Sequence, residues 1–357
     1  SQLDAARAAF LPSVSFEAGY MRGDAPSSYL FKRIDSRKLP ARVDFNSPGD
    51  FGNSEVSAAL NWTLWDAGRR KLARDQAERG VAAAADSRDA VANELIGTTV
   101  QAYHDVLAAG EYVKVADRAL EAVQAQLREV RARHEQGSAL KADVLAIEVR
   151  EAQAHERRIA AGNAVELAQS ALRRLLDMDA NENVSLSGKE WIPAALPAAF
   201  EQGLQDALQD RPELRAIDNR ISAARYGATL ARRQSLPQLD LAGRYWYDDE
   251  ALDFATGRDN WAVGATLAWT AFDGGLRRAG RRGADAALAE LQAVRRSAVR
   301  AIELQVRQGY LNLDEARARF DVAEANVARA EESLSLVKSL FENGSATVTR
   351  YLQSEQD

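Results

Sequence analysis

Few side chains in this 357-residue chain could carry out catalysis, and they are not grouped as a catalytic site requires. The histidines are His104, His134 and His155, and each lies in a stretch with a helical pattern, without a carboxylate or cysteine at catalytic spacing. The chain contains no cysteine, so it offers no thiol nucleophile and no cysteine metal site. It has neither a glycine-rich phosphate loop nor a nucleophile elbow. We therefore expect no enzyme activity, no metal site and no cofactor.

The charge and hydropathy of the chain exclude two further classes of protein. A net charge of −6 gives no basic footprint for a nucleic acid, so we expect no nucleic-acid partner. No apolar run reaches the roughly 18 residues that a membrane-spanning helix needs. The function must therefore be sought in the architecture.

The most informative architectural feature is a long internal repeat. Trp62 and Trp269 lie 207 positions apart, and other landmark residues recur at the same offset without an insertion. A repeat of this length indicates a tandem supersecondary unit rather than a short solenoid. We predict a first repeat at 1–207 and a second at 211–357. The other landmark pairs are Tyr103 with Tyr310, Gly68 with Gly275, and Gly137 with Gly344.

Each repeat begins with a pattern typical of strands. Pro12 and Pro237 each end a helical stretch, because proline moves the residue before it out of the helical region. Apolar and polar residues then alternate with period two, which predicts hairpins with one apolar face and one small or polar face. The expected strands are at about 12–21, 55–65, 238–247 and 260–270. The aromatic residues expected to face lipid are Tyr20, Trp62, Tyr245, Trp261 and Trp269.

The strands are followed by helices of unusual length. No proline interrupts 69–136 or 276–343, and each stretch would be about 100 Å long at about 1.5 Å per residue. Small and apolar residues follow 4,3 spacing along both stretches, which predicts coiled-coil pairing. Asp66 and Asp273 stand where they can cap the first turns.

A glycine ends each long helix and lets the chain turn back. We expect a return helix at 138–177, a linker part-way along the rod at 178–210 and a helix at 211–235. The second return helix, 345–357, is short. The chain also starts only at the end of a helix, and we expect it to be a fragment of a longer protein.

Four strands cannot close a barrel, and open sheet edges cannot face lipid. The smallest common membrane barrels have about eight strands, so the chain must oligomerise. A dimer would supply eight strands and a trimer twelve. Two alternatives stay open at this point: an ordinary sheet packed on a core, and a soluble coiled-coil scaffold.

The order of hairpin, long helix, glycine tip, return helix and linker resembles the TolC-type outer membrane efflux proteins. The segments 65–69 (Trp-Asp-Ala-Gly-Arg) and 272–276 (Phe-Asp-Gly-Gly-Leu) are similar to the strand-to-helix junctions of that family. The resemblance implies an α+β membrane protein, in which four strands per chain form a trimeric twelve-stranded outer-membrane β-barrel. Coiled-coil helices continue the barrel as a periplasmic α-barrel. The implied partners are outer-membrane lipid, a periplasmic adaptor protein and an inner-membrane RND or ABC transporter.

The resemblance also assigns residues. The tips that would contact the adaptor are Gly137, Ser138, Ala139, Gly344, Ser345 and Ala346. The aperture candidates are Asp143, Phe341, Arg350 and Gln353. Arg350 and Gln353 occupy positions that are usually acidic in the family, and Phe341 stands where tyrosine is usual. Three copies of Arg350 would put positive charge at the constriction, with Glu355 as a neighbour for pairing. For each of these residues, a solvated charge on a helix is the alternative.

The resemblance implies a passive exit duct of a tripartite export system, located in the Gram-negative outer membrane and extending into the periplasm. Small-molecule efflux and type I protein secretion use the same body. The sequence does not choose between them.

Overall fold

The computed structural model describes residues 2–42, 44, 46–180, 182, 184, 186, 199–250 and 259–356. The chain divides into two compact units. The first, here called the sheet unit, combines residues 1–87 and 212–299, and the second, the tip unit, combines 88–211 and 300–357. Each unit joins a segment from each half of the sequence, so the compact units do not follow the predicted repeat boundary.

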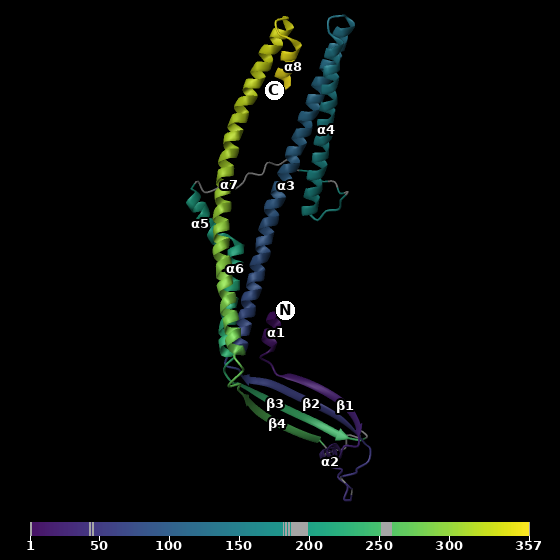
Figure 1. Ribbon diagram of the computed structural model, residues 1–357, viewed down its shortest axis with the longest axis vertical. Helices are drawn as coiled ribbons and strands as arrows, with labels where there is room; N and C mark the ends of the chain where they lie inside the picture. Colours follow the sequence, from purple (N-terminus) through teal and green to yellow (C-terminus); the bar gives the residue numbers. More distant parts are fainter. Residues whose placement is uncertain are drawn as a thin grey trace. The chain divides into compact units, whose positions relative to one another are not determined.

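The sheet unit contains one four-stranded antiparallel sheet with the order β1-β2-β3-β4 (Figure 1). The strands are β1 (Ser13–Gly23), β2 (Phe51–Trp65), β3 (Gln238–Asp249) and β4 (Asp259–Ala268). β2 begins before the predicted position, at Phe51. β4 ends at Ala268 rather than at 270, so Trp269 follows the strand instead of belonging to it.

The first hairpin connection contains a helix that the sequence did not predict. α2 (Pro26–Asp35) begins with proline, which suits a first helical turn because its missing N–H needs no partner there. A further short helix, α1 (Gln2–Ala8), precedes β1.

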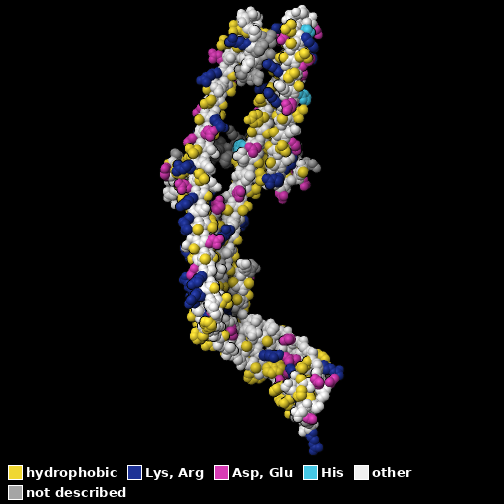
Figure 2. All heavy atoms as spheres, viewed as in Figure 1, with side chains coloured by type: hydrophobic (Ala, Val, Ile, Leu, Met, Phe, Trp, Pro, Cys, Tyr) yellow, Lys and Arg dark blue, Asp and Glu magenta, His cyan; other side chains and the backbone are white. Residues whose placement is uncertain are grey.

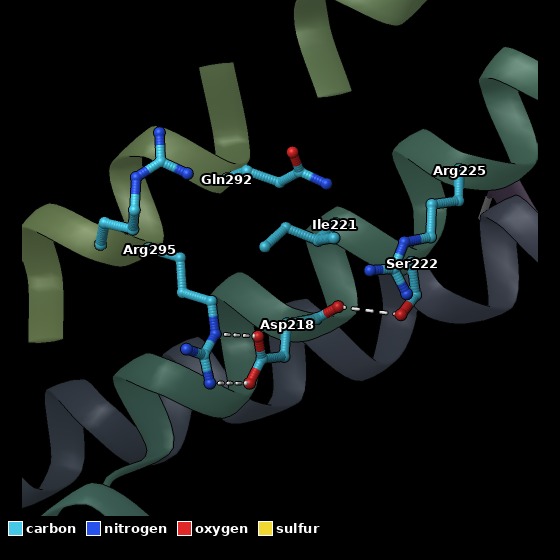
Figure 3. A pocket seen from close by; sticks show the side chains of 7 residues that line it. Asp218, Ile221, Ser222, Arg225, Gln292 and Arg295 are labelled. Carbon is cyan, nitrogen blue, oxygen red and sulfur yellow. Dashed lines mark hydrogen bonds and ion pairs between the residues drawn. The ribbon is translucent and has the colours of Figure 1, made fainter. Parts of the chain in front are cut away.

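Three helices of the sheet unit pack side by side: the first part of α3 (Arg69–Glu135), α6 (Pro212–Arg233) and the first part of α7 (Leu276–Glu342). Ala83 and Ile221 are buried among the small and apolar residues of this packing. Arg295 of α7 makes a two-pronged ion pair with Asp218 of α6, at 2.6 and 3.2 Å, beside a shallow groove between the helices (Figure 3).

The tip unit contains two helical hairpins. α3 runs to Glu135 and returns as α4 (Lys141–Leu175), and α7 runs to Glu342 and returns as α8 (Val348–Gln356). α5 (Phe200–Asp210) is tied to α7 by an edge-on contact of Phe200 with Tyr310, whose ring centroids are 6.0 Å apart. The predicted linker at 178–210 includes α5. Most of the part that precedes α5 lies outside the described residues.

Two small cores hold α3 and α4 together. One contains Leu127, Val130, Val144 and Ile147, and the other contains Ala102, Val106 and Leu172. The 4,3 seam predicted along 69–136 supplies the α3 members of both cores. No helix in the described part of the chain has the length and apolarity needed to cross a membrane.

Candidate functional site: the aromatic sheet and the helical tips

The sheet presents an apolar face that the described part of the chain leaves exposed. Register places Phe16, Ala58, Tyr245 and Trp261 in one row across the four strands. The Phe16 and Trp261 side chains are 81% and 71% exposed. The next row toward the long helices, Val14, Leu60, Gly243 and Val263, has no aromatic residue. An exposed apolar band with aromatic residues at its border is typical of a lipid-facing barrel surface.

A second group of aromatic residues borders the apolar band near the helices. Trp62 Nε1 donates a hydrogen bond of 3.0 Å to the Phe10 carbonyl, and Trp269 Nε1 donates one of 3.1 Å to the Ser235 carbonyl. Trp261 and Trp269 are eight residues apart, which is about 26 Å at about 3.3 Å per residue. This spacing is on the order of the ~25 Å apolar band of outer-membrane barrels.

A bulge adds Trp65 to this second group. The register shifts between Thr63 and Trp65, so Trp65 pairs with Leu239, whose own partner in β4 is Leu267. Strict alternation predicts Leu64 on the apolar face instead. Because a bulge inserts one residue, it turns the following side chain to the opposite face. Sequence reasoning missed this role of Trp65, since period-two patterns carry no signal for a bulge.

The opposite face of the sheet is polar. Glu17, Ser57 and Glu55 lie on it, as does Arg244, which is ion-paired with Glu55. A sheet with one apolar exposed face and one charged face fits a wall between lipid and water. Tyr20, Trp62, Tyr245 and Trp261 lie on the apolar face, as predicted from alternation, and Trp269 follows its strand.

Matching caps join strands to long helices. Asp66 accepts hydrogen bonds from the backbone N–H groups of Gly68 and Arg70, at 3.0 and 2.7 Å. Asp273 accepts the equivalent bonds from Gly275 and Arg277, at 3.1 and 3.0 Å. The Arg277 side chain also donates to Asp273, and this bond holds the pKa of the Asp273 carboxyl below its usual value. Both predicted caps are therefore confirmed.

The two tips are tight left-handed turns. Gly137 and Gly344 have φ values of 78° and 73°, a conformation that glycine adopts without steric cost. The N–H of Ser138 bonds to the Arg133 carbonyl at 2.8 Å, and the N–H of Ser345 bonds to the Leu340 carbonyl at the same distance. The turns satisfy their own backbone groups, and the Ser138 hydroxyl also donates to the Arg133 carbonyl at 2.9 Å. Ser138 and Ser345 are both exposed. Ala139 and Ala346 are half-buried next to them.

An aromatic stack links the second tip to the first. Phe341 stacks on Tyr351, with ring centroids 5.1 Å apart and planes 9° from parallel. The Arg133 guanidinium of α3 lies over the Phe341 ring, 5.3 Å from its centre. Tyr351 also packs against the core of Leu127, Val130, Val144 and Ile147. The α7–α8 hairpin is thereby fastened to the α3–α4 hairpin.

Glu355 strengthens this fastening. Its carboxylate accepts hydrogen bonds from the Tyr351 hydroxyl at 2.8 Å and from Gln126 Nε2 of α3 at 3.0 Å. The bond from Tyr351 to Glu355 raises the pKa of Tyr351 to about 12. We expected Glu355 to pair with Arg350, and the structure instead engages it with Tyr351 and Gln126. Sequence reasoning missed Tyr351, although an aromatic residue four positions before a glutamate on a helix was a usable signal.

The aperture candidates are not brought together as one site. Asp143 accepts a hydrogen bond of 3.0 Å from the Leu140 backbone N–H, so its carboxylate caps α4. Arg350 and Gln353 are exposed on α8. Phe341 lies in the aromatic stack. Within the described residues, no group of histidine and acidic side chains is arranged to hold a metal ion.

Comparison with known proteins decides the family. The family model described as "Outer membrane efflux protein" matches residues 1–177 and 203–357. The chain belongs to the outer membrane efflux protein family. The resemblance seen in the repeats and the strand-to-helix junctions is thus confirmed.

Named members of the family are similar over most of the chain. The outer membrane protein TolC of Vibrio cholerae is 23% identical over 354 residues, which is 98% of this chain and 76% of the relative. The alkaline protease secretion protein AprF of Pseudomonas aeruginosa is 25% identical over 240 residues, 66% of this chain and 47% of that protein. The crystal structure of the CmeC outer membrane channel of Campylobacter jejuni superposes with a TM-score of 0.86 at 18% identity, covering 99% of this chain and 74% of CmeC.

Membership fixes the fold and the location. This outer membrane efflux protein has the α+β fold of the family, in which strands contribute to an outer-membrane β-barrel and long helices extend into the periplasm. Its family and structural relatives are channels rather than enzymes.

Proposed function

We propose that three copies of this chain close a twelve-stranded barrel and form the passive exit duct of a tripartite export system. The single observation that supports this best is the four-stranded sheet, whose apolar face is exposed and whose β1 and β4 edges each have one strand neighbour in the described part of the chain. Since lipid-exposed sheet edges do not occur in a membrane, each edge needs a partner strand from another copy. No catalytic step is required of the duct.

The partners follow from the tips. The proposed contacts of the periplasmic adaptor are the tip residues Gly137, Ser138, Ala139, Gly344, Ser345 and Ala346. Ser138 and Ser345 are exposed at these turns, and this supports the tips as the docking surface. An inner-membrane RND or ABC transporter would complete the pathway, and Asp143, Phe341, Arg350 and Gln353 are proposed to lie near its entrance aperture.

Type I protein secretion is the second candidate. AprF, one of the similar proteins, carries alkaline protease secretion in its name. The proposed duct suits either small molecules or an unfolded polypeptide. Deletion of the gene should therefore be followed by measurements of both drug susceptibility and the secreted proteins. Loss of one secreted protein with unchanged susceptibility would favour secretion.

The oligomer and the docking are tested separately. Native mass spectrometry of the detergent-purified protein should give the mass of a trimer. The strand signal in circular dichroism should be lost only on strong heating. A monomer that stays in solution without detergent would contradict the barrel. Ser345→Trp should then abolish export while the trimer persists, because bulk at the tip blocks the adaptor. Tyr112→Trp, at an exposed position along α3, is the matched control and should export normally.

A further inference from the structure

The unpredicted helix α2 lies on the polar face of the sheet, at the end away from the long helices (Figure 1). Tyr29 packs edge-on against Phe51 of β2, with ring centroids 5.4 Å apart. Lys32 Nζ donates to Glu55 of β2 at 2.5 Å and to Asp248 of β3 at 2.8 Å. These contacts hold α2 on strands that are distant from it in the sequence.

The end of α2 is tied to a third strand. Asn260 Nδ2 of β4 donates a hydrogen bond of 3.1 Å to the Asp35 carbonyl. Register places Glu55 opposite Asp248 and Asn260 opposite Trp246, so all of these contacts are on the polar face. α2 therefore crosses β2, β3 and β4 on the face that carries Glu17 and Arg244. Basic and acidic side chains gather at this end of the sheet in Figure 2.

The acidic partner of the central ion pair is shielded from water. The Asp248 side chain is 0% exposed, and Asn53 also donates to it at 2.8 Å. Lys32 is the basic partner of both Asp248 and Glu55. Removal of one partner from a buried pair leaves an uncompensated charge, which is strongly destabilising. Lys32 therefore holds α2 on β2 and β3 through its bonds to Glu55 and Asp248.

The other side of α2 is open. Phe31 and Ile34 are exposed and lie on the side of the helix away from Tyr29 and Lys32. A helix with its side chains is about 10 Å thick, so its presence on the inner wall takes up space that the sheet alone would leave free. We infer that α2 is a strap inside the outer mouth of the pore that excludes bulky solutes, and that Lys32 holds it in place. This inference rests on the proposed function, because it requires the polar face to line the lumen.

Thiol labelling tests the strap without depending on the periplasmic entrance. These 357 residues contain no cysteine, so an introduced thiol is the one thiol among them. Ala242→Cys places it on the polar face of β3, six residues from Asp248 and toward the long helices. Ala265→Cys places it on the apolar face of β4 as a control. Small and polyethylene-glycol-linked maleimides, both membrane-impermeant, are added outside intact cells.

Two strap variants are compared in the Ala242→Cys background. One replaces residues 26–35 by a glycine-serine linker of equal length, and the other is Lys32→Met. Arg22→Met is the matched control, because Arg22, near the end of β1, forms an exposed ion pair with Asp50, just before β2. We expect the large maleimide to label both strap variants several-fold faster than the Arg22→Met control, while the small maleimide labels all of them at similar rates.

The outcomes separate the two proposals. Equal rates with the large maleimide in all backgrounds, with normal labelling by the small one, would overturn the strap and leave the channel intact. Failure of the small maleimide to distinguish Ala242→Cys from Ala265→Cys would overturn the lumen itself, and with it both proposals. If Lys32→Met does not assemble, the linker variant alone decides.

Discussion

Trp269 donates its indole N–H to the backbone carbonyl of Ser235 at 3.1 Å, and the bond fastens the end of β4 to the residue that precedes a Leu-Pro pair. The first half of the chain repeats this arrangement, since Trp62 bonds to the Phe10 carbonyl before its own Leu-Pro pair. The two bonds brace equivalent corners where helix gives way to sheet.

Loss of these bonds should weaken the assembled protein. Trp269→Phe keeps an aromatic ring and removes the N–H, so each copy should lose about 1 kcal/mol, the net value of a typical hydrogen bond. The measurement is the temperature at which the trimer dissociates on a semi-native gel. Trp261→Phe is the control, because that ring lies in the lipid-facing row. Equal shifts for both variants would show that the Ser235 bond is unimportant.

The junctions before the long helices offer a matched pair of substitutions. Ala67 has a φ of 56° and the equivalent Gly274 has a φ of 66°. A side chain in this left-handed region costs roughly 1–2 kcal/mol, partly offset by the smaller entropy of the unfolded chain. Gly274→Ala should therefore lower the thermal stability of the protein, and Ala67→Gly should preserve or raise it. The reverse order in a thermal melt would contradict this account of the turn.

Tyr351→Phe should loosen the tip unit. The change keeps the stack on Phe341 and the contact with the Val144 core, but it removes the hydroxyl bond to Glu355. If the channel entrance lies at this tip, the conductance of the Tyr351→Phe channel in planar bilayers should be higher than that of the wild type. Tyr112→Phe removes a hydroxyl from an exposed tyrosine of α3 and should leave conductance unchanged. Equal conductance of the two variants would show that the Tyr351 hydroxyl has no role in gating.

The same tyrosine predicts a pH dependence at the alkaline end. Its pKa is raised from the ordinary 10.0 to about 12, so the folded tip holds the proton more tightly than the unfolded chain does. The stabilisation is complete below pH 10, and it is lost as pH rises through about 12. The tyrosinate absorbance of wild-type protein minus that of Tyr351→Phe should titrate near the upper value. A difference curve centred near 10 would show that the Glu355 bond does not form.

Much of this architecture could be predicted because it is written in local patterns. Alternation of apolar and polar residues locates the strands. Asp66 and Asp273 mark the helix starts because each caps backbone N–H groups within four residues. The glycines at the tips are needed by the turns themselves. These features depend on neighbours in the sequence, so a single chain is enough to find them.

The features that were missed depend on distant partners. α2 is a short helix in a proline-containing connection, and Lys32 meets Asp248 across 216 positions of sequence. Glu355 meets Gln126 across 229 positions, which is why its pairing with nearby Arg350 was the wrong expectation. The bulge before Trp65 changes the face of a side chain without changing the composition of the strand. Only the folded sheet and the folded tip reveal these relationships.

The two outer strands carry a consequence for biogenesis. β1 and β4 each expose a ladder of peptide groups along one side of the described sheet. In hydrocarbon, every such group without a partner costs several kcal/mol, so the bilayer should reject a solitary copy. Insertion and assembly must therefore be a single concerted event, and its rate should depend steeply on how many newly made chains meet at the membrane surface.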